Sequence, residues 1–164
     1  MGVFETALVL STLLSALVAG FVFAFASVVM PGIQGLNDRE FLRTFEAMDL
    51  VIQRKQPAFM LVWVGSVISL LATVLLSFWH IAGVDRMLLA LAAAIYLIGV
   101  QLPTATINVP LNNSVQELEL DSLDDSDINE ARVRFEDRWI TWNRIRTILA
   151  VLTSALLIVL ILRL

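Results

Sequence analysis

Long apolar stretches alternate with shorter polar ones along this chain, and the apolar stretches carry no polar stripe. Three of them contain no Asp, Glu, Lys or Arg: Thr6–Asn37, Gln56–Val84 and Met87–Gln116. A fourth, shorter stretch covers Thr147–Leu162. About 20 apolar residues are enough for a helix to cross the hydrocarbon core of a bilayer. The pattern therefore predicts an all-α fold, an integral membrane four-helix bundle.

The predicted membrane helices lie near Ala7–Met30, Ala58–Ser77, Met87–Asn108 and Trp139–Leu162. A soluble four-helix bundle would show a polar face on each helix, whereas these segments are apolar all round. No repeat or low-complexity linker divides the sequence, so we expect a single membrane domain over residues 1–164. The first segment is too long for a signal peptide and has no basic residue before it, so we expect no cleavage there.

Prolines mark the expected helix ends. The tripeptide Met30–Gly32 is expected to end the first helix, because proline has no backbone N–H and glycine permits a turn. In the third helix, Pro103 should free the carbonyl of Gly99, and Pro110 should free that of Thr106. Carbonyls freed at membrane depth need donors, so we expect polar partners at this end of the bundle.

An amphipathic helix is predicted near residues 38–55, between the first two membrane segments. Asn37 can cap it, with Glu40 three residues on as a capping box requires. Its apolar face is formed by Phe41, Phe45, Met48 and Ile52. Asp49 falls outside that face. We expect this amphipathic helix to lie at the membrane interface, and the alternative is that it folds over the mouth of the bundle.

Composition agrees with the membrane prediction and limits the chemistry. The 164 residues are 59% hydrophobic and 16% charged, with mean hydropathy +0.84. There is no cysteine, and His80 is the only histidine. Transition metals and haem require several such ligands, so we expect this chain to hold neither metal nor cofactor by itself. The net charge of −4 argues against nucleic acid as a partner.

Lysine and arginine concentrate in the two long loops, which follow the first and third helices and lie on one side of the bilayer. These residues are Arg39, Arg43, Arg54, Lys55, Arg132, Arg134 and Arg138. The opposite side holds only Arg86 and Arg163. By the positive-inside rule the long loops face the cytoplasm and both termini face outward, which we expect in a bacterial inner membrane. In the second loop, Asp127 or Asn129 is expected to cap a short helix that runs into the fourth span.

The stretch WITWNRIRT opens the fourth helix and brings polar side chains to membrane depth. One helical face, at i, i+3, i+4 and i+7, carries Trp139, Trp142, Asn143 and Arg146. Arg146 falls near or inside the hydrophobic boundary, where a charge facing lipid is costly. Arg144 can thread its charged end to the interface, but the face of Arg146 is expected to turn inward.

On the third helix, Gln101, Thr104 and Asn108 share a face at the same level. Two interpretations remain open. These side chains and Arg146 form a structural clamp between the two helices, or they line a small-molecule pocket. In the second case Arg146 and Asn143 are donors, and Trp139 and Trp142 are walls, as in other mostly apolar pockets with a few polar groups.

The chain resembles the anthrone oxygenase family in its four short membrane helices and two motifs. The motifs are NVPLN at Asn108–Asn112 and WxxWNxxRT at Trp139–Thr147. The resemblance implies that the shared site includes Asn108, Asn112, Trp142, Asn143 and Arg146. One departure is that Gln53 and Gln56 stand where the family pattern leads us to expect an asparagine. Fungal members oxidise anthrones to anthraquinones, which implies an aromatic or quinone-like substrate.

This chemistry suits a site without a metal. An anthrone is acidic for a carbon acid because its anion is an aromatic phenolate, and that anion can react with dioxygen directly. Arg146 and Asn143 are the predicted catalytic donors to the oxyanion. No general base is evident, although Glu136 and Asp137 are near in sequence. The alternative is a non-catalytic accessory or structural subunit of a larger membrane complex, and a homo-oligomer is also compatible with the sequence.

Overall fold

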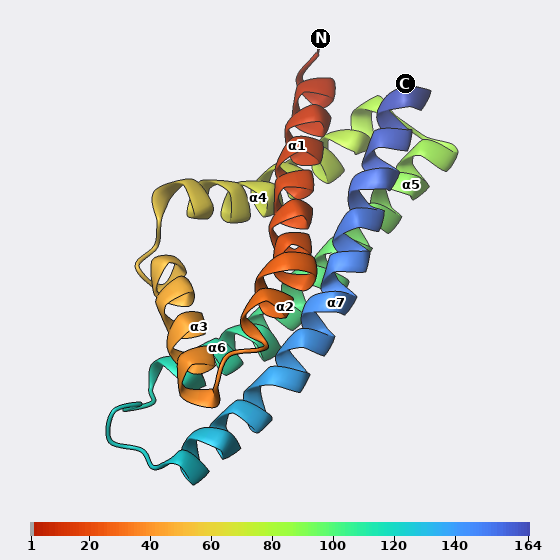
Figure 1. The fold of residues 1–164 in the computed structure, drawn as a ribbon. Helices are drawn as coiled ribbons and strands as arrows, with labels where there is room; N and C mark the ends of the chain where they lie inside the picture. The colour runs from red at the N-terminus through yellow and green to blue at the C-terminus, as the bar shows by residue number, and fades with distance from the viewer. Residues whose placement is uncertain (1) are drawn as a thin grey trace.

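The computed structural model describes residues 2–164, and every regular element in that part of the chain is a helix. Four helices are long and apolar enough to cross a membrane: Val3–Ile33, Pro57–His80, Gly83–Gln116 and Asp125–Arg163. They run up and down, so that both termini lie at one end and the two long loops at the other (Figure 1). The predicted class, a helical integral membrane bundle, is confirmed.

The first long helix combines α1 (Val3–Ala24), a wide π-helical turn η1 (Phe25–Val29) and α2 (Met30–Ile33). This helix ends at Ile33, one residue beyond the predicted end at Met30–Gly32, and Pro31 lies inside its last turn. A π turn leaves one carbonyl without a partner in the helix. A proline, which has no N–H to donate, therefore follows such a turn without interrupting the helix.

The third long helix also passes through its prolines. It consists of α5 (Gly83–Ala94), η2 (Ile95–Gln101), η3 (Thr104–Asn108) and α6 (Val109–Gln116). The predicted end near Asn108 was therefore wrong by about two turns. Pro103 and Pro110 each lie two residues after the last residue of a π-helical segment, as Pro31 does. A π-helical segment followed by a proline thus keeps both the first and the third membrane helix continuous at the same end of the bundle.

The fourth long helix, α7 (Asp125–Arg163), has 39 residues. At 1.5 Å per residue it is about 58 Å long, roughly twice the hydrocarbon thickness. The short helix expected to run into the fourth span is its continuous first part, but the predicted cap at Asp127 or Asn129 was wrong. Asp124 is the cap, accepting a hydrogen bond from the backbone N–H of Asp127 at 2.9 Å. No glycine or proline follows within α7, so nothing separates its polar first half from the apolar second half.

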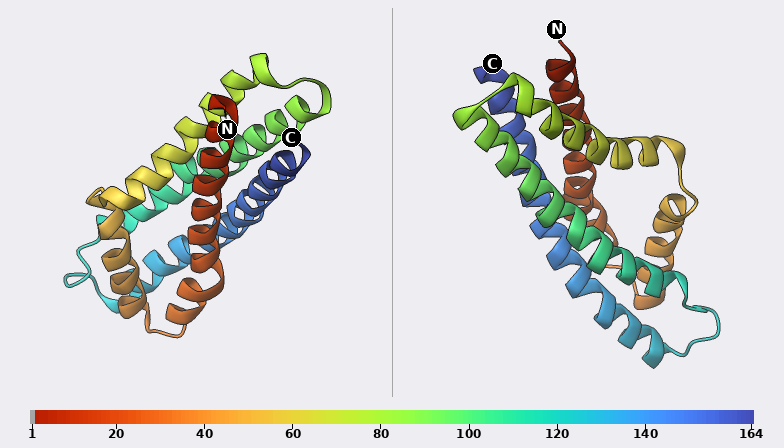
Figure 2. Two further views of the ribbon diagram at one scale, coloured as in Figure 1. Left: turned by 90° about the horizontal axis from the view of Figure 1, so that it is seen from above. Right: turned by 180° about the vertical axis from the view of Figure 1, so that it is seen from behind.

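The amphipathic helix is α3 (Asp38–Gln53), capped as predicted by Asn37, whose Oδ1 accepts from the N–H of Glu40 at 2.9 Å. It packs against α6 and the polar half of α7, so it folds over the end of the bundle (Figure 2). Phe41 and Phe45 are buried as predicted, and Asp49 is buried contrary to prediction. The helix α4 (Pro57–His80) then returns into the bundle alongside α1.

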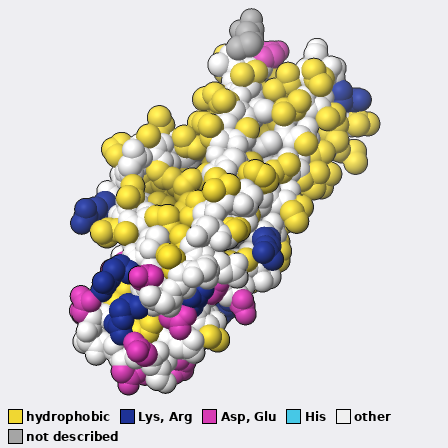
Figure 3. Space-filling view, in the orientation of Figure 1, with side chains coloured by type: hydrophobic (Ala, Val, Ile, Leu, Met, Phe, Trp, Pro, Cys, Tyr) yellow, Lys and Arg dark blue, Asp and Glu magenta, His cyan; other side chains and the backbone are white. Residues whose placement is uncertain are grey.

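Two apolar clusters fill the interior. The first lies among the apolar parts of the four long helices and contains Leu70, Tyr96 and Leu157. The second lies under α3 and contains Phe41 and Phe135. Charged side chains gather over this second cluster, whereas the surface of the first is largely hydrophobic (Figure 3). A cavity lies where the two clusters meet.

Candidate functional site

A cavity of about 190 Å³ lies between α1, α3, α4, the third helix and α7. A single water needs only about 10–15 Å³ measured in this way, so the cavity has room for an organic molecule. Its aromatic wall is formed by Phe21, Phe25, Phe45, Phe59, Trp63 and Trp139. Its polar lining is formed by Asp49, Thr104, Asn108, Asn112 and Arg146. The composition is that of a ligand pocket, mostly apolar with a few converging polar groups.

Arg146 is the cation of this cavity, and only 5% of its surface is exposed. Its Nη1 donates to Oγ1 of Thr104 at 2.9 Å, and its Nη2 donates to Oδ1 of Asn143 at 2.9 Å. Its Nε is buried and has no hydrogen-bond partner among residues 2–164. The guanidinium carbon lies 5.5 Å from the ring centre of Trp139. Of five N–H donors, two are used, so the helix contacts do not exhaust the group.

Two buried asparagines flank the arginine. Asn143 donates from Nδ2 to the carbonyl of Val22 at 3.1 Å and holds Arg146 through its oxygen, but it does not line the cavity. Asn108 lines the cavity and donates to the carbonyl of Trp139 at 3.3 Å. The Oδ1 of Asn108 is buried and accepts no hydrogen bond from the described part of the chain. Asn108 and Arg146 therefore present an acceptor and a donor that the protein itself leaves unpaired.

A second polar group lies on the opposite helix, α3. The buried carboxylate of Asp49 accepts from Nδ2 of Asn112 at 2.6 Å. Its other oxygen accepts from Gln53 and Gln116, both at 3.1 Å. Asn112 in turn accepts from Nε1 of Trp139 at 2.7 Å. This chain of bonds joins α3, α6 and α7 around one end of the cavity.

A family model for anthrone oxygenase matches residues 48–156, which include every polar residue of the cavity lining. The chain belongs to the anthrone oxygenase family. No curated protein and no solved structure matches the chain.

Some of the residues predicted for the site of this anthrone oxygenase family member line the cavity, and others do not. Asn108, Asn112, Trp139, Thr104 and Arg146 line the cavity. Asn143 contacts it only through Arg146. Trp142 is half-buried outside the lining, and Gln101 accepts from Nε1 of Trp63 at 3.0 Å instead. Arg146 bonds to side chains rather than to the proline-freed carbonyls we expected. The roles of these residues in binding or catalysis stay predictions.

Asp49 is the residue that sequence reasoning missed in this family member. It sits among the charged positions of an amphipathic helix, which are ordinarily solvated. The available signal was its spacing, since Phe45 and Asp49 are four residues apart and therefore share a helical face. Gln53 lies one further turn along and bonds to Asp49, so the departure from the family pattern falls on a contact of this carboxylate.

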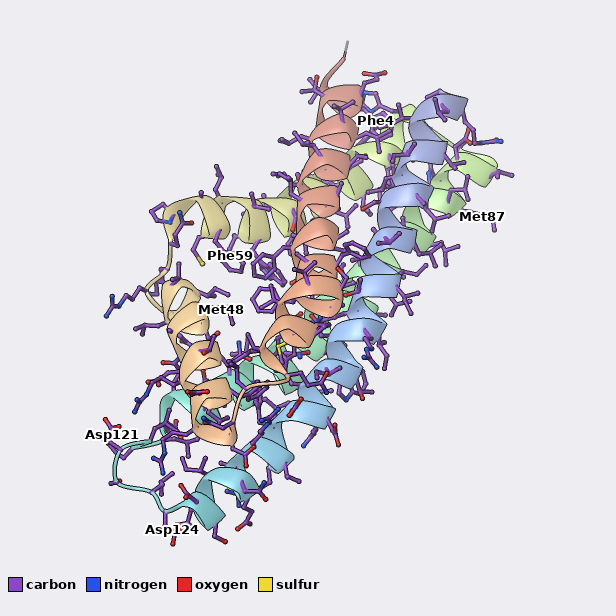
Figure 4. The ribbon with its side chains drawn as sticks, viewed as in Figure 1. Phe4, Met48, Phe59, Met87, Asp121 and Asp124 are labelled. Carbon is purple, nitrogen blue, oxygen red and sulfur yellow. The ribbon has the colours of Figure 1, made fainter. Side chains whose placement is uncertain are left out.

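The aromatic wall was also missed, because phenylalanines in membrane helices give no signal that distinguishes a pocket from a core. Phe21, Phe25 and Phe59 line both the cavity and an open apolar groove beside it. The groove lies between the first helix and the α3–α4 connection, and Met48 and Phe59 border it from α3 and α4 (Figure 4). The cavity thus shares part of its aromatic wall with an apolar groove on the surface of the molecule.

Metal ligands do not cluster in the part of the chain that the structure describes. Within residues 2–164, no three side chains of His, Cys, Asp or Glu come together in a way that could hold a metal ion. The expectation that this family member works without a bound metal or cofactor stays a prediction, to be tested by metal analysis of the purified protein.

Proposed function

We propose that this protein is a membrane-embedded oxygenase that binds a flat, acidic aromatic molecule of the anthrone or quinone type in the cavity beside Arg146. The observation that carries the proposal is the state of Arg146. It is buried, and within residues 2–164 no carboxylate lies within 4.0 Å of its nitrogens. Burying a charge without a counter-ion costs several kcal/mol. An anionic ligand would supply the missing partner.

The remaining walls fit the same ligand. Six aromatic side chains surround the cavity, and flat rings gain from offset or edge-to-face contact with them. The unpaired Nε of Arg146 and the unpaired oxygen of Asn108 provide polar contacts at one end. A ring system with one ionised oxygen therefore matches both the apolar walls and the polar end.

The reaction that suits this site is the oxidation of an anthrone to an anthraquinone. Loss of one proton from the methylene carbon gives an electron-rich phenolate. Dioxygen then adds at that carbon, and loss of water completes the change, so that anthrone and O₂ give anthraquinone and H₂O. The guanidinium of Arg146 stabilises the negative charge on the phenolate oxygen. A preorganised hydrogen-bond donor of this kind usually makes the largest contribution to lowering such a barrier.

The position of the groove favours entry of an apolar substrate from the bilayer. The groove shares Phe21, Phe25, Ile52 and Phe59 with the cavity, so a molecule dissolved in lipid reaches the site without crossing the charged end. We further propose that the charged end faces the cytoplasm of a bacterial inner membrane, as the Lys and Arg counts indicate. Association into a homo-oligomer or a larger membrane complex is the corresponding proposal for partners.

The test is oxidation of a hydroxylated anthrone by protein purified in detergent, followed by anthraquinone absorbance and oxygen uptake above the protein-free rate. Arg146→Lys keeps the charge but loses the planar fork of donors. We expect it to lower the rate about 10²–10³-fold, the usual effect of losing an oxyanion donor. The exposed neighbour Arg144, changed to Lys, serves as the matched control and should leave the rate unchanged.

The non-catalytic alternative makes the opposite forecast for the same proteins. If Arg146 serves only to join helices, the wild-type protein will not accelerate anthrone oxidation, and Arg146→Lys will change only thermal stability. Quenching of tryptophan fluorescence by an added anthraquinone provides a separate measure of binding, because Trp63 and Trp139 line the cavity. Absence of both quenching and rate acceleration would leave the accessory-subunit function standing.

A further inference from the structure

We propose that Asp49 is the general base of this reaction: its carboxylate takes the acidic proton of the substrate while charge develops on the oxygen held by Arg146. This inference rests on the proposed function and deepens it. It assigns the proton acceptor to a residue of α3, outside the membrane helices that carry the other polar groups of the site.

The surroundings of Asp49 keep its carboxylate in place and available. Only 3% of the residue is exposed, yet it lines the cavity. Within the described residues no Lys or Arg nitrogen lies within 4.0 Å of it. Three side-chain amides donate to it, one to Oδ1 and two to Oδ2. A carboxylate has about four acceptor positions, so Oδ1 retains one for a substrate proton.

The hydrogen-bond chain places the base and the cation around one aromatic ring. Asn112 donates to Asp49 and accepts from the indole N–H of Trp139. Arg146 lies against the ring of the same tryptophan, 5.5 Å from its centre. The carboxylate and the guanidinium thus line one cavity without forming an ion pair with each other. A direct pair would neutralise both groups, whereas here each group remains available to a molecule bound in the cavity.

The proposed step conserves atoms and charge. The methylene C–H bond of the anthrone breaks, and its proton forms an O–H bond with Oδ1 of Asp49. The bonding pair moves into the ring system, and the carbonyl oxygen becomes a phenolate that accepts from Arg146. Asp49 becomes a neutral acid and the substrate an anion, with no oxidant consumed. Asp49 returns the proton when the oxygenated intermediate loses water.

Because this step precedes the use of dioxygen, exchange without oxygen isolates it. Purified protein in anaerobic D₂O should accelerate replacement of the methylene hydrogens of a hydroxylated anthrone by deuterium, measured by mass spectrometry against the protein-free rate. Asp49→Asn keeps the size and most hydrogen bonds of the side chain but removes the base. We expect the protein-dependent exchange to fall about 10²–10⁴-fold, the range for loss of a general base.

Two further variants keep the result interpretable. Asp137→Asn removes an exposed carboxylate of α7 and should leave exchange at the wild-type rate. Asp49→Glu retains a carboxylate on a longer side chain, and we expect intermediate exchange with unchanged anthraquinone quenching. Asp49→Glu also tests the proposal if Asp49→Asn fails to fold. Its carboxylate is displaced by one methylene group, so deuterium exchange at the full wild-type rate would contradict a base that must be accurately positioned.

The two proposals fail in different ways. If the wild-type protein neither exchanges nor oxidises the anthrone above background, the proposed function is overturned, and the role of Asp49 with it. If the wild-type protein does both and folded Asp49→Asn exchanges equally fast, only the assignment of Asp49 is overturned. Loss of exchange in Asp49→Asn with retained quenching by anthraquinone supports both proposals.

Discussion

At the scale of single residues, the buried guanidinium of Arg146 depends on few partners. Thr104 is its only hydrogen-bond acceptor on the third helix within the described chain. The hydroxyl of Thr104 donates in turn to the carbonyl of Val100 at 2.7 Å, which fixes its lone pairs toward Arg146. This bond connects the third and fourth membrane helices at the level of the cavity, as do the bonds between Trp139 and the two asparagines Asn108 and Asn112.

We predict that Thr104→Val lowers the free energy of unfolding in detergent by about 1–3 kcal/mol, the cost of leaving a buried donor unsatisfied. Thr106 provides the control, since it is exposed and its hydroxyl bonds only to the carbonyl of Leu102 in its own helix. Thr106→Val should change stability by less than about 0.5 kcal/mol, as other surface substitutions do. Denaturant titration of both variants measures the difference, and equal effects would contradict a role for the Thr104–Arg146 bond.

At the scale of elements, α3 forms a wall of the site because it is fastened to α7. Arg132 of α7 donates to the carbonyls of Gln34 and Leu36, both at 2.8 Å, and forms ion pairs with Asp38 at 3.0 Å and Glu136 at 2.6 Å. The hydrogen bond that Nδ2 of Asn129 donates to the carboxylate of Asp38, together with the charge of Arg132, holds the pKa of Asp38 below its ordinary value. These contacts fix the start of the helix that carries Asp49.

Arg132→Gln is expected to loosen α3 and reduce stability by about 1–3 kcal/mol, because two carbonyls and two carboxylates lose a nearly buried donor. Activity should fall as well, since Asp49 moves with α3. Arg134 is two residues away and 67% exposed, and it pairs only with Glu130 one turn earlier. Arg134→Gln should cost less than about 0.5 kcal/mol, as exposed pairs contribute little. Thermal unfolding and hydrogen exchange of residues 38–53 distinguish the two variants.

At the scale of the whole molecule, charge is divided between the two ends. The end formed by α3, α6 and the first half of α7 is covered by charged side chains, and Asp121 and Asp124 lie at its tip (Figures 3 and 4). The end with both termini carries few charges, among them the pair between Arg163 and Asp85 at 2.7 Å. The molecule therefore projects one folded polar end from the membrane.

We predict that this polar end is cytoplasmic, and single cysteines can test it because the chain has none. Ser122 marks the polar end, and Ala82 marks the other. Ala82 is preferable to Gly83, whose φ of 56° strains any other side chain. A membrane-impermeant thiol reagent on intact cells should label Ala82→Cys only. Labelling of Ser122→Cys alone would contradict this prediction and show that the polar end faces outward.

The sequence by itself determined the membrane fold and the inner face of the fourth helix. Both depend on local properties: the length of apolar runs against bilayer thickness, and the helical phase of Trp139, Asn143 and Arg146. The amphipathic helix and its cap at Asn37 were predicted for the same reason. The helix ends were not, because a proline after a π turn leaves the helix intact, and hydrogen-bond register is invisible in residue types.

Only the tertiary structure decided the surroundings of Asp49. On its own helix it is one more charged position, and its burial depends on where α3 docks against α6 and α7. That docking brings Asn112 and Gln116, more than 60 residues away in sequence, to its two oxygens. The packing likewise left Trp142 outside the cavity although it shares a helical face with Arg146. Helical phase states which side chains face inward, whereas contact between distant segments decides which of them meet a ligand.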